Sequence, residues 1–352
     1  MKPTRAYEID LLRFCAALAV VLFHWSFRGA AAGGPSALSY PWLAPAARYG
    51  YLGVELFFMI SGFVILMSAS GGSMRDFLVS RLVRLYPAFW VCCSLTFVWA
   101  WLAADPKFVF RLWQYVVNLS MLSGFVGVPS IDGVYWSLFV EIRFYLLVLL
   151  VLAFGWMPRI ERLLALWLAV ATLQQVVRTG PLWHWLMAEH AAFFIGGATC
   201  FVIYRQGGTA QRYLVLFGAW MLALYRSIQA VAELDVQLGS GLDPFTIGLI
   251  VSVFFALMLG VASGRLGALR RPVWLSLGML TYPLYLLHQN IGYMVFNQWH
   301  GRVNVHLLFW GSLVAILLAA WAVHRWVERP VARWMKSKLD KAFKRTPLRT
   351  AA

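Results

Sequence analysis

Arg13 and His24 carry ionisable side chains inside the first membrane-length apolar segment of the chain. A charged group in hydrocarbon is costly, so such a residue is by default a candidate for function. Eleven residues at about 100° each return His24 to within about 20° of Arg13, roughly 16 Å further along a helix. Asp10 falls on nearly the same stripe. One helix face therefore combines a carboxylate, a guanidinium and an imidazole, which can bind an anion and move a proton.

The alternative is that these are helix-end residues whose side chains reach the two membrane interfaces. This accounts for Asp10 and in part for Arg13. It does not explain why Asp10, Arg13 and His24 share one face, so we favour a functional role.

Glu141 lies about two helical turns into another apolar segment, which opens with Trp136 and Ser137. Its side chain is too short to reach the interface, so we expect it to face the protein interior and to need a partner. Arg143 lies on a different face and is not the obvious partner. Glu55 is in a similar position in an earlier segment. A structural ion pair and a catalytic role remain open for both glutamates.

Arg81 and Arg84 stand three residues apart, shortly before Pro87, and therefore share a helix face. Two guanidinium groups side by side suit a phosphate, because each can donate two parallel hydrogen bonds. The alternative is topology anchoring of the kind that Arg75 provides, and sequence alone favours that alternative.

Thr281, Tyr285 and His288 form a polar stripe in a later segment. An aromatic stripe is usually core packing, but a polar stripe that ends in histidine is less often so. A functional His288 and an interior histidine with satisfied hydrogen bonds both remain open. Ser61 resembles a nucleophile only superficially, since a serine in a membrane helix usually bonds to its own helix carbonyl. No histidine or cysteine spacing predicts a metal site.

The composition is that of a membrane protein. Hydrophobic residues make up 61% of the chain and charged residues 12%, with a mean hydropathy of +0.71, whereas soluble domains carry about 25% charged residues. We expect an all-α bundle of about ten transmembrane helices. The predicted spans are approximately 9–27, 49–69, 85–103, 135–154, 162–177, 186–204, 213–229, 244–262, 273–295 and 305–323.

The net charge of +16 follows from topology. With the N-terminus in the cytoplasm, about three times as many Lys and Arg residues fall on the inner side as on the outer side, which predicts that both termini are cytoplasmic. The basic charge therefore does not predict nucleic-acid binding. Glu8, Asp10 and Arg13 interrupt the first apolar run, so we expect a retained span rather than a cleaved signal peptide.

The predicted membrane domain covers residues 1–330 and is followed by a tail, 331–352. Residues 331–352 are basic, with apolar residues at helical spacing, and predict an amphipathic helix on the anionic inner leaflet. Residues 230–243 carry acidic residues without Lys or Arg and predict an outer loop. The sequence gives no indication of an oligomer.

Six of these segments, in order, resemble the integral-membrane acyltransferase 3 family, which contains O-acetyltransferases of bacterial surface polysaccharides. Any one of them would be a weak match, but together they extend over nearly the whole chain. They are Ile9–Arg13 continued through His24, Gly53–Phe63, Arg81–Pro87, Trp136–Glu141, Tyr282–His288 and Val327–Pro330.

The resemblance implies a multi-pass enzyme of a bacterial inner membrane that takes an acyl group, most simply acetyl, from cytoplasmic acyl-CoA as co-substrate, with no bound cofactor. It implies that Arg13 and His24 act together and that Arg81 and Arg84 hold the donor. Supporting roles fall to Asp10, Glu55, Trp136, Ser137, Tyr285 and His288. Arg143 stands where similar proteins often have an uncharged residue, and the hydrolase-like domain of some relatives has no counterpart here.

On this interpretation His24 is the general base on an acceptor hydroxyl of an exported or lipid-linked glycan, and Glu141 orients it or balances its charge. Acylation of His24 itself is the alternative chemistry. A transporter or flippase that uses Arg13, His24 and Glu141 as a proton relay is the rival class, although no inverted repeat is visible. A cytoplasmic small molecule as acceptor is a third hypothesis.

Overall fold

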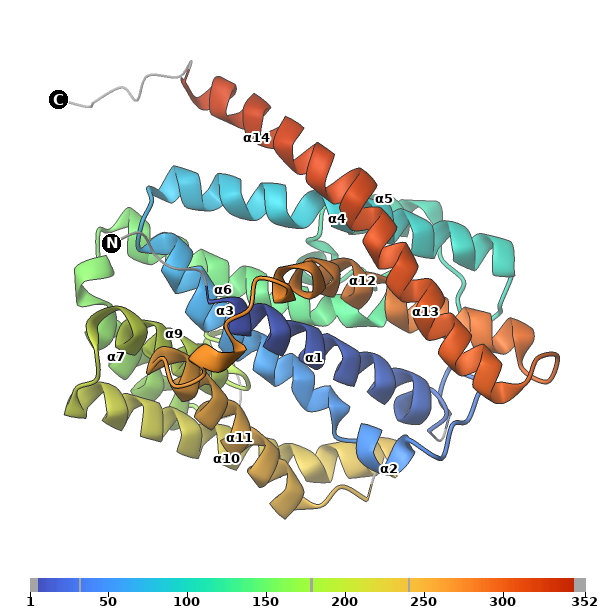
Figure 1. Cartoon of the computed structure of the whole chain (residues 1–352), viewed down its shortest axis with the longest axis horizontal. Helices are drawn as coiled ribbons and strands as arrows, with labels where there is room; N and C mark the ends of the chain where they lie inside the picture. The colour runs from blue at the N-terminus through green and yellow to red at the C-terminus, as the bar shows by residue number, and fades with distance from the viewer. Residues whose placement is uncertain (1–5, 32, 178–179, 240, 345–352) are drawn as a thin grey trace.

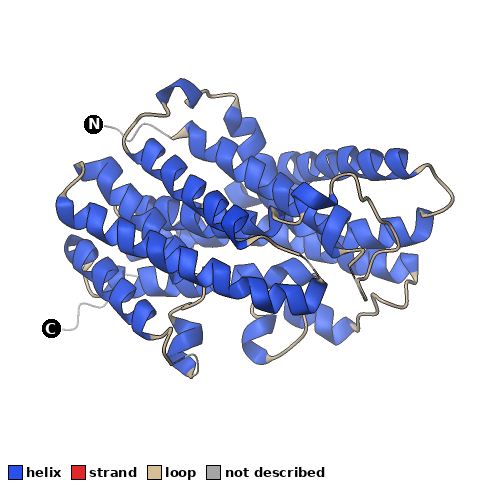
Figure 2. Ribbon diagram, turned by 90° about the horizontal axis from the view of Figure 1, so that it is seen from below, coloured by secondary structure: helices blue, strands red, loops and turns tan. Residues whose placement is uncertain are grey.

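The computed structural model describes residues 6–344 except 32, 178, 179 and 240, and within these it contains helices and connecting turns without a strand. Figure 1 shows the long helices lying side by side with their axes roughly aligned, and Figure 2 shows the same bundle from below with helices throughout. The fold class is therefore all-α, as predicted.

Within the described residues, ten long helices form the bundle, and one more continues the last of them. They are α1 (Tyr7–Phe23), α3 (Gly53–Ala69), α4 (Met74–Ala103), α6 (Trp136–Ala153), α7 (Ile160–Leu173), α9 (Ala191–Gln206), α10 (Ala210–Leu238), α11 (Pro244–Ala262), α12 (Trp274–Trp299), α13 (Val305–Val323) and α14 (Arg329–Lys344). Short helices in the connections are α2 (Ala44–Ala47), α5 (Leu112–Asn118) and α8 (Pro181–Trp185), with single turns η1 (His24–Arg28), η2 (Gly50–Leu52), η3 (Ser123–Val126), η4 (Gly133–Tyr135), η5 (Met157–Arg159), η6 (Gly267–Leu269) and η7 (His324–Glu328).

Every predicted span coincides with a helix, but the helices differ in length and polarity. Among the described residues, seven helical stretches are long and apolar enough to cross a membrane. The other three are α7 and α9, with 14 and 16 residues, and α12, which has 26 residues but carries polar groups along its length.

Several predicted boundaries were wrong for local reasons. Helix α4 begins at Met74 rather than near 85, because Ser73 and Asp76 form a capping box in which each side chain accepts a hydrogen bond from the other's backbone N–H. Helix α7 ends at Leu173, four residues early. Helix α10 continues to Leu238, so much of the predicted outer loop at 230–243 is helical.

Close packing of α3 against α9 forms the densest part of the interior. A Cβ atom on Gly197 would lie 1.7 Å from the carbonyl oxygen of Met59, and one on Gly62 would lie 2.2 Å from that of Phe194. Only glycine permits this approach. Small residues at helix contacts are the usual solution in a membrane, where lipid supplies no hydrophobic drive for helix association.

The first helix and α12 pack together, and both carry predicted site residues. Helix α1 ends in η1, a π-helical turn that begins at His24, in which the backbone N–H of Gly29 donates to the carbonyl of His24. In this wider turn, the hydroxyl of Ser26 donates a 2.7 Å hydrogen bond to the carbonyl of Leu22. Such turns frequently mark functional sites.

Helices α13 and α14 are one continuous rod, joined by the π-helical turn η7. Figure 1 shows α14 crossing α4 and extending past the bundle towards the C-terminus. The predicted amphipathic tail is thus helical as far as Lys344 and follows Pro330 without a break. Residues 345–352 of that tail lie outside the described residues.

Candidate active site

A cavity of about 310 Å³ brings together residues from α1, α3, α4, α6 and α12. We call it the arginine cavity, because Arg13, Arg81 and Arg84 all line it. Its wall also contains polar side chains predicted for the site, together with aromatic and aliphatic ones. The polar wall residues are Ser61, Ser80, Ser137, Glu141, Tyr145, Thr281, Tyr282 and Tyr285. Five helices separated in sequence therefore build one chamber.

Glu141 finds its partner in Ser61, whose hydroxyl donates a 2.7 Å hydrogen bond to Oε1 of the carboxylate. The expectation that Ser61 bonds to its own helix was wrong, because Glu141 of α6 offers a charged acceptor, which makes a stronger bond than a carbonyl. Arg143 instead lies 5.2 Å from the Phe125 ring, on another face, as expected.

Ser137 and Tyr285 form a second polar pair on the cavity wall. Their hydroxyl oxygens are 2.7 Å apart, and both hydroxyls also lie within hydrogen-bond distance of the carbonyl of Val134, at 3.1 and 3.2 Å. One of the two hydroxyls must donate to the other, so this pair fixes α6 to α12 beside the cavity.

The two arginines of α4 are held differently. Arg81 donates to the hydroxyls of Ser80 and Ser68, at 3.1 and 3.3 Å, and its guanidinium lies 5.6 Å from the Phe77 ring. Among the described residues it forms no ion pair with a carboxylate, so its positive charge stays available to the cavity. Arg84 forms an ion pair with Glu328.

Glu328 is almost fully buried, whereas about a third of the Arg84 side chain is exposed. The second carboxylate oxygen of Glu328 lies 3.0 Å from Nδ1 of His324, so η7 supplies both Glu328 and a further polar partner for it. The sequence placed Glu328 in the Val327–Pro330 segment but did not predict that it reaches the cavity arginine.

Arg13 has charged neighbours of both signs. It interacts electrostatically with Glu141 and Asp10 as well as with Arg84. Asp10 is buried and does not line the cavity, but it packs against Gly278, which does. Asp10 therefore lies behind the wall, where it offsets part of the positive charge.

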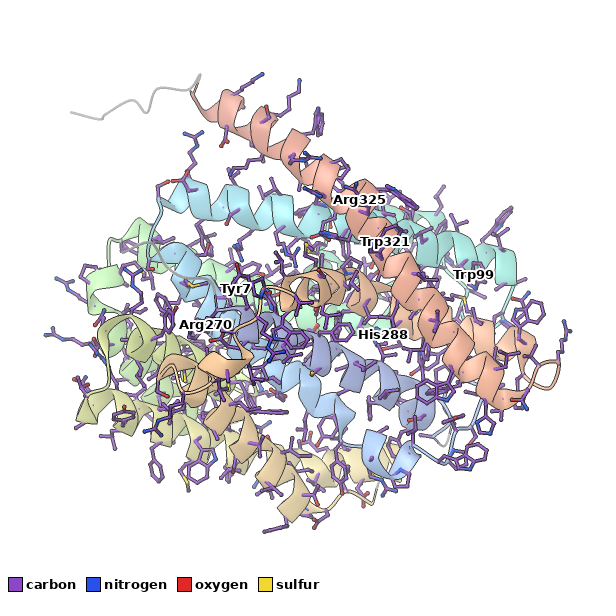
Figure 3. The ribbon with its side chains drawn as sticks, in the orientation of Figure 1. Tyr7, Trp99, Arg270, His288, Trp321 and Arg325 are labelled. Carbon is purple, nitrogen blue, oxygen red and sulfur yellow. The ribbon has the colours of Figure 1, made fainter. Side chains whose placement is uncertain are left out.

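His24 and His288 lie outside the residues that line the arginine cavity and contact each other. Nδ1 of His24 is 2.9 Å from the carbonyl of Val20 and 3.1 Å from Nε2 of His288. Nδ1 of His288 is 2.8 Å from the carbonyl of Tyr285, a cavity residue. Figure 3 shows His288 within the bundle, between the ribbons of α1 and α12.

Glu55 and Trp136 belong to a different cluster. Nδ1 of His190, which precedes α9, lies 3.1 and 3.3 Å from the two carboxylate oxygens of Glu55. The rings of Phe58 and Trp136 are 4.9 and 5.5 Å from the His190 ring. Sequence reasoning missed His190, because it lies at a helix end without a motif.

Asp132 is a further polar residue that the sequence did not single out. It is fully buried and accepts hydrogen bonds from the backbone N–H groups of Asn290, at 3.0 Å, and Val134, at 3.2 Å. Burial raises the pKa of this carboxyl to about 7. It anchors the loop before α6 to α12, two residues beyond His288.

Within the described part of the chain, no group of three or more His, Cys, Asp or Glu side chains has a geometry that could hold a metal ion. The four cysteines are free thiols, of which Cys92, Cys93 and Cys200 are buried.

Over 371 aligned residues the chain is 26% identical to nodulation protein 10 of Rhizobium leguminosarum bv. viciae, with 93% of each protein covered. It is 31% identical to a putative peptidoglycan O-acetyltransferase of Bacillus subtilis, over 40% of the chain and 22% of that protein. It is 26% identical to a peptidoglycan O-acetyltransferase of Listeria monocytogenes, over 51% of the chain and 30% of that protein.

The chain thus spans less than a third of the length of the two peptidoglycan O-acetyltransferases. No solved structure matches it. The acyltransferase domain family matches residues 6–325, which include the arginine cavity and the two contacting histidines. The chain therefore belongs to this acyltransferase family and is a multi-pass membrane enzyme that transfers acyl groups.

Proposed function

We propose that this enzyme moves an acyl group, most simply acetyl, from cytoplasmic acyl-CoA to a hydroxyl of a cell-surface or exported glycan in a bacterial inner membrane. The observation that carries the proposal is the arginine cavity, in which three guanidinium groups converge on one chamber inside a membrane bundle. The names of two relatives as peptidoglycan O-acetyltransferases support a glycan acceptor.

The assignment of acyl-CoA as the donor rests on the positive charge of the cavity. The phosphates of acyl-CoA need several cationic groups, and Arg81 and Arg84 lie near the start of α4, where the charge bias predicts the cytoplasm. A cavity of about 310 Å³ holds only part of a molecule as large as acyl-CoA. We therefore infer that the arm bearing the thioester enters the cavity while the nucleotide stays at its mouth.

The activation of the acceptor hydroxyl is assigned to His24. In the proposed step, Nε2 of His24 removes the proton from an acceptor hydroxyl as its oxygen forms a bond to the thioester carbonyl carbon. The carbon–sulfur bond then breaks, and the thiolate of CoA takes the proton back from His24. The products are the acyl ester and CoA thiol, so protons and electrons balance. Ser137 and Tyr285 lie on the cavity wall, and whichever of their hydroxyls turns from the carbonyl of Val134 can donate to the carbonyl oxygen as it becomes negative.

Glu141 lies in the same chamber as Arg13, and its carboxylate is oriented by Ser61. We assign it the role of balancing the positive charge of the cavity, so that the arginines hold the donor phosphates without trapping the product CoA. It has no direct contact with His24, which removes the reason to regard it as a partner of the imidazole.

The test uses purified protein in nanodiscs with radiolabelled acetyl-CoA and an N-acetylglucosamine oligosaccharide or a crude lipid-linked glycan extract as acceptor. Wild type should release CoA and label the glycan, and His24→Ala should lose both while still binding acetyl-CoA. His300→Ala is the matched control, since His300 is an exposed histidine in a turn.

Each of three results would contradict part of the proposal. Label trapped on His24 in the absence of acceptor means an acyl-histidine intermediate rather than direct transfer. Transfer only to acceptors on the cytoplasmic side of sealed vesicles means a cytoplasmic acceptor. Folded wild type that turns over no acyl-CoA with any acceptor refutes the donor assignment and favours transport.

A further inference from the structure

We propose that His288 is a positioning residue that holds His24 in the tautomer with its proton on Nδ1, which leaves Nε2 as the basic nitrogen. This inference rests on the proposed function of His24 and adds a second acceptor, beside the carbonyl of Val20, for the proton on its Nδ1. It follows from the polarity of three contacts, which join His288 to the carbonyl of Tyr285, His24 to the carbonyl of Val20, and the two rings to each other.

The first contact fixes His288. Its Nδ1 lies 2.8 Å from the carbonyl oxygen of Tyr285. A carbonyl oxygen only accepts hydrogen bonds, so Nδ1 of His288 must carry a proton. In a neutral ring, Nε2 of His288 is then an acceptor with a free lone pair.

The second and third contacts fix His24. Its Nδ1 lies 2.9 Å from the carbonyl oxygen of Val20, so this nitrogen must also carry a proton. The same N–H lies 3.1 Å from Nε2 of His288 and is shared between the two acceptors. A protonated Nε2 on His288 would set two N–H groups against each other, so the geometry requires a neutral His288.

The remaining nitrogen of His24, Nε2, is then the only unprotonated nitrogen of its ring. His24 is partly exposed, whereas His288 has no exposed surface. Only His24 can therefore meet a substrate. His288 acts through it, in the way that an orienting group fixes the tautomer of a catalytic histidine.

The surrounding contacts hold His288 still. Its own carbonyl accepts a 2.8 Å hydrogen bond from Nε1 of Trp25, the residue after His24. Two residues further along α12, the N–H of Asn290 donates to Asp132. The end of α1 and its turn η1 are thus held against α12 by the side chain of His288 and by its backbone carbonyl, within one helical turn.

The arrangement also suits the chemistry of the step. When Nε2 of His24 takes up the acceptor proton, the ring becomes cationic and its Nδ1–H bond to His288 becomes charge-assisted, hence stronger. Because His288 is neutral, it stabilises this transient cation less than a carboxylate would. His24 can therefore return the proton to the CoA thiolate in the second half of the reaction.

The first measurement is ¹⁵N NMR of histidine-labelled wild type in nanodiscs, with the His24 signals assigned from the spectrum of His24→Gln. We expect a protonated Nδ1 and an unprotonated Nε2 on His24. A protonated Nε2 on the neutral ring would overturn the proposal. So would an unchanged His24 tautomer in folded His288→Phe, because the carbonyl of Val20 would then hold the proton without His288. Neither readout depends on activity.

Two variants of His288 test its action on the rate. His288→Phe keeps a buried ring but removes the acceptor, and we expect kcat to fall about 100-fold with an unchanged KM for acetyl-CoA. His288→Gln keeps an acceptor near the position of Nε2 and should recover about 10-fold of that loss. Folded His288→Phe with wild-type kcat would overturn the proposal, as would equal losses in both variants.

The outcomes separate this inference from the function on which it rests. Wild type without acyl transfer refutes the function while the tautomer remains measurable. Active wild type in which His24→Ala is inactive but His288→Phe is unaffected supports the function and refutes the role of His288.

Discussion

Arg84 of α4 and Glu328 of η7 form an ion pair across 244 positions of sequence, and this pair joins the arginine cavity to the C-terminal rod. One partner lines the cavity, and the other is buried against it beside His324. A residue proposed to bind the donor is therefore also a structural contact, so a single substitution of Arg84 confounds two effects.

A double-mutant cycle separates them. Arg84→Gln should raise the KM for acetyl-CoA and also lower the Tm, because it leaves the buried carboxylate of Glu328 without its cation, at a cost of about 1–3 kcal/mol. Adding Glu328→Gln should restore most of the Tm, since a neutral amide has no need of a cation. The KM should stay raised in the double variant. Recovery of the KM together with the Tm would mean that Arg84 has no contact with the donor.

Arg81 offers the cleaner test of donor binding, because its polar contacts are serine hydroxyls. We expect Arg81→Gln to raise the KM for acetyl-CoA about 10-fold to 100-fold, since a hydrogen bond to a charged group contributes about 1.5–3 kcal/mol. The effect should vanish with acetyl-pantetheine, which lacks the nucleotide phosphates. Arg205→Gln, at the exposed end of α9, is the control and should leave both KM values unchanged.

Glu55 and His190 should behave as a structural pair. Neither lines the arginine cavity, and each retains about 15% exposure of its side chain. We predict that Glu55→Gln and His190→Gln each destabilise the protein by about 1–2 kcal/mol with kcat nearly unchanged, and that the double variant is no worse than either. Thermal unfolding and steady-state rates on the same preparations check this. A kcat loss in folded Glu55→Gln would place the pair in the chemistry instead.

Asp132 should make stability depend on pH. Burial raises the pKa of its carboxyl from 3.8 to about 7, so the folded protein binds a proton that the unfolded chain releases. This contribution to stability is fully present below pH 3.8 and is lost as the pH rises to about 7. The Tm of wild type should therefore fall across this window relative to that of Asp132→Asn. Parallel Tm curves for the two proteins would show that Asp132 does not titrate there.

The sequence predicted the helices well because length and hydropathy determine them locally. It also found the arginine cavity in part, since Ser137 and Glu141 lie on one helical stripe and Arg81 and Arg84 on another. These stripes are properties of single helices and can be counted along the chain.

The contacts between residues on different helices could not be predicted from helical periodicity. They depend on how each helix is rotated and tilted against its neighbour. Ser61 meets Glu141 across 80 positions, and His24 meets His288 across 264. The stripe through Arg13 and His24 does face α12 at both points, but only Arg13 lines the cavity. His190 and Asp132 lie at helix ends, where periodicity gives no signal.

The two π-helical turns have a consequence for how this protein can vary. Each of them inserts one residue without breaking the helix, so everything after the turn is rotated by about 100° relative to what precedes it. After η7, the face that α14 presents is therefore offset by this rotation from the face that α13 presents. Substitutions on the surface of α14 can then change one end of the rod while α13 keeps its neighbours in the bundle. The change of face occurs at η7, which begins at His324.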